Sequence, residues 1–249
     1  MRKLVLVAVL VSAVAGTARA DWEPGMDCKM HYPQLPDLQM GLDVLCQEPK
    51  WLADDFKCIQ TGAITDIHIW GSWLFDEVGQ PTFLIEIYPD IPATPDMHSM
   101  PALEAGPLWG RQFMPGEYVD RPYADAFELF FDPNQNEIIG EDTTCWQYNF
   151  YIDPDEAFRQ TEGEIYWLAV TTLPEGPGMF GWKTSMDHWN DDAVFFDRAG
   201  GPVLVPQELI HPILGESLDL AFVITPEPAT MVLLGLGLVG LAARRRRKK

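Results

Sequence analysis

The sequence predicts an all-β protein, a single antiparallel β-sandwich of the jelly-roll type with only short helical turns. Three observations predict it. Short apolar runs recur along residues 51–225, several of them alternate with period two, and Gly, Pro, Asn and Asp separate them. The 21 prolines of the 249-residue chain also leave little room for long helices. Residues 21–225 suit one domain, because all-β sandwiches of about 200 residues commonly fold as one unit.

The strand pattern is clearest in residues 64–73 and 82–88. In the first segment Ile67 and Ile69 fall on one face and His68 on the other, as in a half-buried strand. The second repeats the alternation, and residues 78–81 predict the turn between them. Residues 89–107 predict a proline-rich loop, and 155–160 a turn or two of helix. The further strand candidates are 108–113, 126–131, 145–152, 165–172, 193–196 and 218–224.

The N-terminus predicts a cleaved signal peptide over residues 1–20. A basic start at Arg2 and Lys3 precedes an apolar stretch, and Ala18-Arg19-Ala20 forms a small-residue cleavage site. Residues 21–50 then predict a loop-like, proline-rich N-terminal segment ahead of the domain at 51–225.

The C-terminus, residues 226–249, has three parts in order. The triplet Pro226, Glu227 and Pro228 precedes an apolar run over 229–243, and a basic cluster follows, comprising Arg244, Arg245, Arg246 and Arg247 with two lysines. As a helix the run spans about 22 Å, short of a hydrocarbon core of about 30 Å. A transient stop in the inner membrane is expected, with the cations on the cytoplasmic side.

This order resembles the PEP-CTERM sorting signal of Gram-negative bacteria. The resemblance implies that Pro226, Glu227 and Pro228 are recognised by an exosortase, a membrane-embedded protease, and that Arg244–Arg247 are the retention cluster. It implies export through the inner membrane and processing for the cell surface or extracellular matrix. A single-span protein that keeps its tail is the alternative. The body, through the runs 53–56, 65–73, 145–150 and 180–184, resembles an uncharacterised secreted domain of PEP-CTERM proteins.

Charge is concentrated in the part between the two ends. The whole chain carries −20, but nine of its 17 basic residues lie in residues 1–20 and 226–249, so that residues 21–225 carry about −28. Such a surface repels phosphate backbones, which excludes nucleic acid as an expected partner.

Four cysteines, Cys28, Cys46, Cys58 and Cys145, lie in a chain bound for an oxidising compartment. Two disulfides are expected, with three pairings open. We favour Cys28 with Cys46 and Cys58 with Cys145. No spacing is of the CxxC kind, so a zinc or redox site has little support.

Candidate ligand sites follow from composition rather than from a motif. Asp54 and Asp55, with Asp191 and Asp192 near His188, are weak calcium candidates, and no other cofactor is expected. Residues 132–136 have the oxygen spacing of a calcium loop but lack its glycine, which favours a turn. A sugar-stacking platform has four candidates: Trp70, Trp73, Trp182 and Trp189. For most of them a core position is the stronger interpretation.

The sequence carries no motif for catalysis. It has no G-x-S-x-G, H-E-x-x-H or phosphate-binding loop, and its five histidines lack metal-ligand spacing. We therefore expect a non-catalytic structural or interaction protein with no catalytic residues. One alternative is a carbohydrate-binding module, with or without calcium, that binds extracellular polysaccharide. The weaker alternative is a polysaccharide-active hydrolase, for which two carboxyls would suffice.

Overall fold

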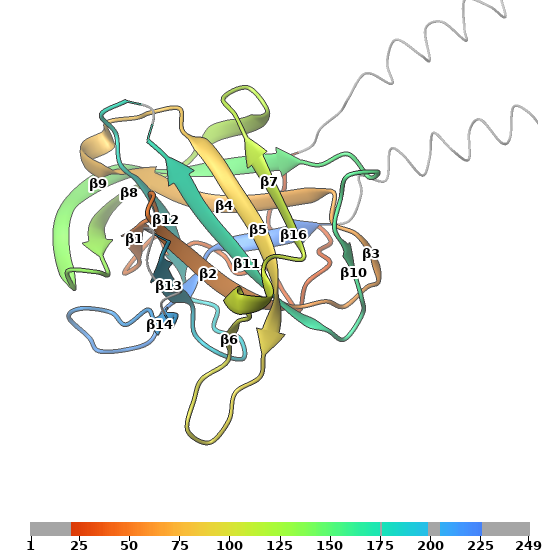
Figure 1. The fold of residues 1–249 in the computed structure, drawn as a ribbon. Coiled ribbons are helices and arrows are strands. Elements are labelled where there is room, and N and C mark those ends of the chain that lie inside the picture. Colours follow the sequence, from red (N-terminus) through yellow and green to blue (C-terminus); the bar gives the residue numbers. More distant parts are fainter. Residues whose placement is uncertain (1–20, 175, 199–204, 226–249) are drawn as a thin grey trace, which may run out of the picture. The chain divides into compact units, whose positions relative to one another are not determined.

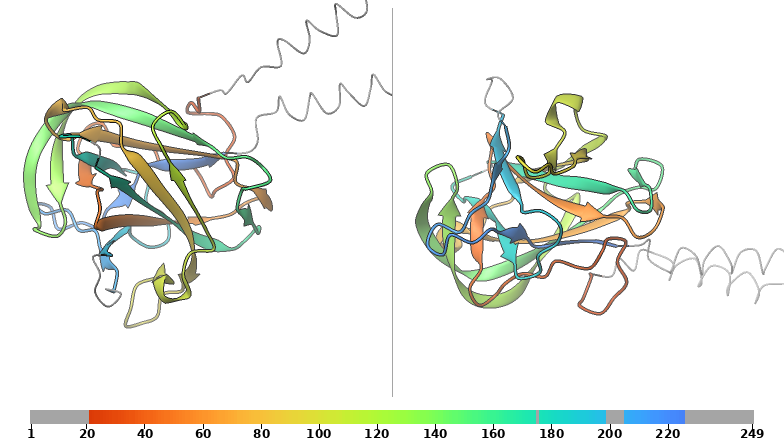
Figure 2. Two further views of the ribbon diagram at one scale, coloured as in Figure 1. Left: turned by 45° about the horizontal axis from the view of Figure 1, so that its top comes forward. Right: turned by 90° about the horizontal axis from the view of Figure 1, so that it is seen from below.

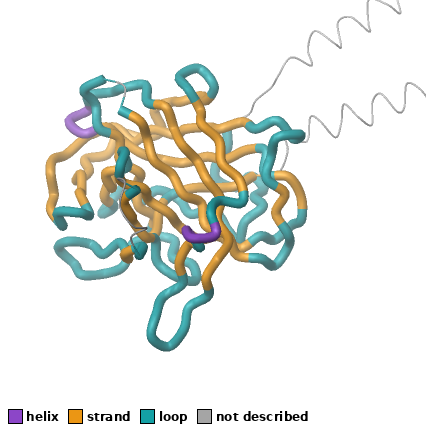
Figure 3. The backbone as a smooth tube through the Cα atoms, in the orientation of Figure 1, coloured by secondary structure: helices purple, strands orange, loops and turns teal. Residues whose placement is uncertain are grey.

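The computed structural model describes residues 21–174, 176–198 and 205–225 (Figure 1). The chain divides into two compact units, and the larger, Asp27–Pro226, contains all strands of the described residues. The signal peptide and the sorting tail predicted from the sequence lie outside the described residues. Strands dominate the described part (Figure 3), which confirms the all-β class.

The first sheet has the order β15-β12-β1-β8-β9-β4-β16. Because β12 also pairs with β4, five of these strands close into a ring. Strand β1 runs parallel to β8 and antiparallel to β12, so residues of the predicted N-terminal segment enter the sheet. The bounds are β1 Leu42–Leu45, β4 Asp66–Trp73, β8 Tyr118–Asp132, β9 Glu137–Tyr151, β12 Phe180–Ser185, β15 Asp219–Leu220 and β16 Phe222–Thr225.

The second sheet has the order β14-β13-β2-β11-β5-β6, with β7 also paired to β5. Its strands are β2 Lys50–Lys57, β5 Thr82–Ile91, β6 Met100–Pro101, β7 Trp109–Phe113, β11 Ile165–Leu173, β13 Val194–Asp197 and β14 Gln207–Glu208. The remaining elements are a small pair, β3 Gly62–Ala63 with β10 Arg159–Gln160, and the 3₁₀ turns η1 Leu74–Asp76 and η2 Leu103–Ala105.

Aromatic side chains fill the space between the two sheets. Phe83 of β5 lies about 5 Å, centroid to centroid, from rings of the first sheet, with edge-on or tilted contacts to Tyr118, Tyr148, Phe150 and Phe180. Such contacts add to the free energy gained by burying the rings. On its opposite face the second sheet carries a separate buried cluster that includes Trp51, Tyr88, Trp167 and Phe196.

The strands differ from the sequence-based expectation mainly in length. Strands β8 and β9 form a long curved pair (Figures 1 and 2), whereas only 126–131 and 145–152 were predicted. Bulges between Pro122 and Phe131 bend this pair and interrupt the alternation that sequence analysis relies on. The helix predicted over 155–160 is wrong. Residues 154–156 form a turn, and Arg159 and Gln160 pair with β3.

Gly71 lies where two strands of the ring approach closely. A Cβ atom at this position would lie 2.3 Å from the backbone oxygen of Gly181 and 2.5 Å from the Phe180 ring. We expect Gly71→Ala to lower the free energy of unfolding by about 1–3 kcal/mol, because the backbone must shift. Gly110→Ala is the matched control, since its Cβ would meet the flexible Glu86 side chain at 3.1 Å. Equal urea midpoints for the two variants would contradict the prediction.

Candidate functional site

The sorting residues Pro226, Glu227 and Pro228 and the cluster Arg244–Arg247 lie outside the described residues. Within residues 21–174, 176–198 and 205–225, the structure contains no helix that is long and apolar enough to cross a membrane.

The expected disulfides are not formed, because all four cysteines are free thiols. Each belongs to a different part of the fold. Cys46 follows β1 and donates to the Val170 carbonyl at 3.3 Å, and Cys28 donates to the Met30 carbonyl at 3.3 Å. Cys58 follows β2, and Cys145 lies within β9, where burial raises the pKa of its thiol. An oxidising compartment predicts that neighbouring cysteines form disulfides, but it does not predict which cysteines are neighbours in the fold. A disulfide needs the Cα atoms of its two cysteines within about 7 Å of each other.

The four tryptophans proposed as a sugar platform do not form one. Trp70, Trp73 and Trp182 are core residues, exposed by at most 2%. The Trp182 indole donates to the Ala221 carbonyl at 2.8 Å, and the Trp73 indole to the Tyr148 hydroxyl at 2.8 Å. Only Trp189 is partly accessible, and it stacks on His31 at 4.2 Å between ring centroids.

The calcium candidates are split by the pleat of β2. Neighbouring residues of a strand point to opposite faces, so Asp54 and Asp55 diverge. Asp54 accepts hydrogen bonds from the Leu220 amide at 2.6 Å and from Gln34 at 2.9 Å. Asp55 accepts from Asn190 at 2.5 Å, on the loop between β12 and β13. That loop also carries Asp191 and Asp192. Of the two β2 candidates, therefore, Asp55 is the one that lies beside the loop.

Around that loop the structure gathers an acidic edge, which we define as Asp55, His188, Asp191, Asp192, Glu208 and Asp219. Two groups in it could each hold a cation: His188, Asp192 and Asp219, and Asp191, Asp192 and Glu208. In each group one ligand atom per residue lies within 4.8 Å of the others. Asp219 and Glu208 come from β15 and β14, and no pattern in the sequence marks either of them.

Two carboxyls of the acidic edge, Asp55 and Asp219, bind protons more tightly than ordinary aspartates. Burial raises the pKa of Asp55 to about 8, the Asn190 hydrogen bond lowers it, and Asp219, Asp90 and Asp191 raise it further. Burial also raises the pKa of Asp219 to about 6, against lowering by the Trp189 amide and His188. One oxygen of each carboxyl has no hydrogen-bond partner among the described residues. A cation bound there would have to displace protons.

A second acidic group is deeply buried and was not predicted. Asp43 of β1, Glu128 of β8 and Asp142 of β9 surround Lys183 of β12, and each is exposed by at most 2%. The Lys183 ammonium lies 2.8 Å from Glu128 Oε1 and 3.4 Å from Asp43 Oδ2. The one available signal was a charged residue inside an apolar strand, as in Phe180–Ser185.

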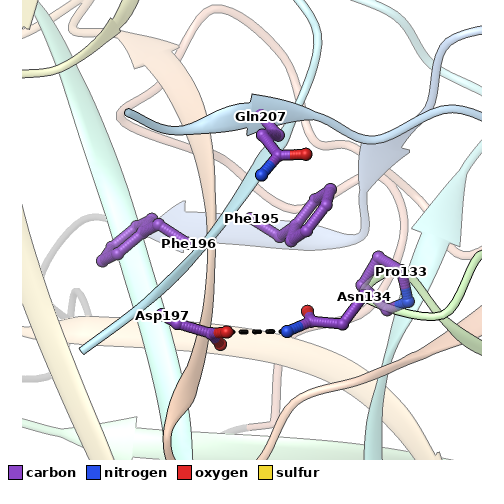
Figure 4. A pocket seen from close by; sticks show the side chains of 6 residues that line it. All are labelled: Pro133, Asn134, Phe195, Phe196, Asp197 and Gln207. Carbon is purple, nitrogen blue, oxygen red and sulfur yellow. Dashed lines mark hydrogen bonds between the residues drawn. The ribbon is translucent and has the colours of Figure 1, made fainter. Parts of the chain in front are cut away.

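Residues 133–136 form the turn that was predicted in place of a calcium loop. Asp132 forms an ion pair with Lys50. Beside the turn lies a hollow of about 120 Å³, shown in Figure 4 and lined by Pro133, Asn134, Phe195, Phe196, Asp197 and Gln207. Asn134 donates to Asp197 at 2.7 Å across it. An adjoining hollow of about 290 Å³ shares Asn134 and Asp197. Sites for drug-sized ligands typically measure about 300–1,000 Å³.

Comparison with known proteins gives two matches. Residues 30–225 match a family model described as "Domain of unknown function (DUF7901)", and residues 225–247 match the PEP-CTERM protein-sorting motif. No curated protein matches the chain. The second match confirms the sorting signal expected at the C-terminus. This motif implies export and processing by an exosortase.

Proposed function

We propose that this chain, which belongs to the DUF7901 family, is a non-catalytic structural or interaction module at the cell surface. The PEP-CTERM motif accounts for its export and its processing by an exosortase. The observation that best supports a structural role is the use of its aromatic residues. Trp51, Trp70, Trp167 and Trp182 are each exposed by at most 2% and contribute to packing rather than to a binding face.

Calcium is the ion that we propose for the acidic edge. Calcium takes six to eight oxygen ligands, and carboxylates on three separate segments can supply several. Hydrogen bonds hold the Asp191 carboxylate in position: one oxygen accepts from the Ser99 amide at 2.6 Å and the other from the Asp192 amide at 3.3 Å. The ion would tie the loop between β12 and β13 to β14 and β15, and so stiffen one edge of the module.

Calcium should therefore raise the melting temperature of the protein at pH 8, and chelator should reverse the effect. We expect Asp192→Asn to abolish the increase, because Asp192 belongs to both groups of the acidic edge. Asp153→Asn, on an exposed turn outside both groups, is the matched control and should respond like the wild type. An equal calcium response in both variants would contradict a site at this edge.

A second candidate function is carbohydrate binding, which the hollow of Figure 4 favours. Phe195 offers a half-buried ring beside the amides of Asn134 and Gln207 and the Asp197 carboxylate. An aromatic face flanked by polar groups suits a sugar ring. The hollow measures only about 120 Å³, so it fits the end or edge of a polysaccharide better than an enclosed oligosaccharide.

Co-sedimentation with the host's extracellular polysaccharide separates the functions. A structural module should stay in the supernatant, with and without calcium, and release no sugar. Pelleting that Phe195→Ala abolishes would establish the carbohydrate-binding alternative instead, with Phe127→Ala, an exposed ring on β8, as the control. Sugar released into the supernatant would establish a hydrolase and overturn the non-catalytic proposal.

A further inference from the structure

Lys183 is held at the centre of the buried group by strand register. Asp43 and Lys183 are directly paired in the β1–β12 ladder, and Glu128 reaches the same ammonium from β8, the other neighbour of β1. The side chains of Lys183 and Asp43 are both 0% exposed. A Cβ atom on Gly181 would lie 2.6 Å from the Phe130 ring and 3.0 Å from Asp43 Cβ, so an aromatic ring closes this side.

The charges of this group require a particular distribution of protons. Burial raises the pKa of Glu128 to about 8, and the charge of Asp43 contributes to this shift. Burial also raises the pKa of Asp142 to about 9, with contributions from Asp43 and Glu128. Both acids therefore carry protons at neutral pH. A hydrogen bond between Glu128 and Asp43 adds to the first shift. What remains is a buried ion pair of Lys183 and Asp43, with a neutral carboxylic acid in contact with both.

We propose that Lys183 and Asp43 condense into an intramolecular amide, an isopeptide bond that covalently joins β12 to β1, and that Glu128 relays the protons. The inference does not depend on the role proposed above. Its basis is the contact of one buried amine with one buried carboxyl and one proton donor, each on a different strand.

The reaction balances without any co-reactant. The Lys183 ammonium first passes one proton to Asp43, which leaves a neutral amine and a carboxylic acid. The Nζ lone pair attacks Asp43 Cγ while the carbonyl oxygen takes the proton of Glu128. The Glu128 carboxylate then removes a proton from Nζ and delivers it to the leaving hydroxyl. The C–O bond breaks and one water leaves. The remaining oxygen, which still carries the proton first taken from Glu128, returns it as the amide carbonyl forms, so Glu128 regains its original state.

Two physical effects favour the bond. An ion pair is costly to bury, because both charges lose their hydration, whereas an amide is neutral. Burial alone would lower the pKa of Lys183, but Asp43 and Glu128 raise it, so the internal proton transfer is the step that needs assistance. The paired strands also hold amine and carboxyl in contact, which replaces a bimolecular encounter by a step within one molecule.

A second buried lysine–aspartate pair, Lys50 and Asp132, serves as an internal control for the Lys183–Asp43 pair. These residues also form a buried ion pair, but Asp132 accepts further hydrogen bonds from the Asn134 amide and from Gln135. Although burial works against it, the hydrogen bonds from Lys50, Asn134 and Gln135 lower the pKa of Asp132. This carboxylate stays ionised and is a poor electrophile. Lys50 should therefore remain a free amine.

Peptide mapping of the denatured full-length chain tests the proposal. We expect a linked peptide that joins Lys183 to Asp43 and is lighter than its two parts by one water, about 18 Da. Lys50 should appear only in unlinked peptides. Separate Lys183 and Asp43 peptides from the folded wild type would overturn the proposal. So would a link to Lys183 that persists in Asp43→Ala.

The relay has a separate test. Glu128→Gln should slow bond formation by about 100-fold, the effect expected of a general acid–base. Should that variant fail to fold, judged by circular dichroism, wild-type chain that is recovered in denaturant before it has ever folded, and is therefore unlinked, can be refolded at several pH values. A relay through protonated Glu128 makes the bond form more slowly at pH 10 than at pH 6. Unassisted attack by a free amine would be faster at pH 10, and this result would overturn the relay.

Discussion

Lys183→Met should lower the free energy of unfolding by about 3–5 kcal/mol, the usual cost of removing one partner from a buried ion pair. Methionine has nearly the length of lysine but cannot compensate Asp43, whose side chain is 0% exposed. Any covalent link would be lost as well, and with it the constraint on a loop of more than 100 residues, which is valued at about 4–5 kcal/mol in the chain-entropy account. Urea titration of both proteins measures the difference.

The control for this variant is Lys57→Met, at the exposed end of β2. It removes the same charge from the surface and should change the stability by no more than about 0.5 kcal/mol. The Lys183→Met deficit should also shrink in acid, because protonating the neighbouring carboxyls removes the uncompensated charge. A Lys183→Met protein as stable as Lys57→Met at neutral pH would show that the buried pair contributes nothing to stability.

The sequence predicted those parts of the fold that have a local pattern. Alternation located β4 and β5, and the two neighbours of β5, β7 and β11, were found nearly in full. Strand β1 was missed because it has four residues within a proline-rich segment and carries no alternation that marks a face. The closure of β12 onto β4 is a tertiary contact that depends on Gly71 and Gly181, not on a propensity.

The candidate sites were less predictable because they depend on register. Asp43 and Lys183 are 140 positions apart, and only the β1–β12 ladder sets them opposite each other. Asp54 and Asp55 looked like one site in the sequence, yet the pleat sends their side chains to different partners. The cysteines were assigned from compartment alone. Spacing within the chain predicts a site when its residues lie on one turn or loop, but not when they lie on separate strands.

The protein should be most stable in mild acid and lose stability continuously between about pH 4 and pH 9. Burial raises the pKa of several carboxyls above their ordinary range, among them Asp219 to about 6, Asp55 to about 8, Glu128 to about 8 and Asp142 to about 9. Between the ordinary value and the raised one, the folded state holds a proton that the unfolded chain has lost. Unfolding then releases protons, so rising pH favours the unfolded state. The direction is opposite to that of carboxylates held in salt bridges, which lose stability in acid.

Asp55→Asn tests this dependence at one position. An asparagine resembles the protonated acid and can still accept the hydrogen bond that Asn190 donates to Asp55. Near pH 4, before the unfolded chain has lost this proton, the substitution should change the stability little. At pH 9 the wild type has lost the contribution of this group, at about 1.4 kcal/mol for each unit of raised pKa, and the variant should be more stable by several kcal/mol.

Asp153→Asn, on an exposed turn, should leave the pH profile unchanged. Parallel profiles of melting temperature for wild type and Asp55→Asn would mean that Asp55 is already ionised in the folded protein, and would transfer the pH dependence to the group around Lys183.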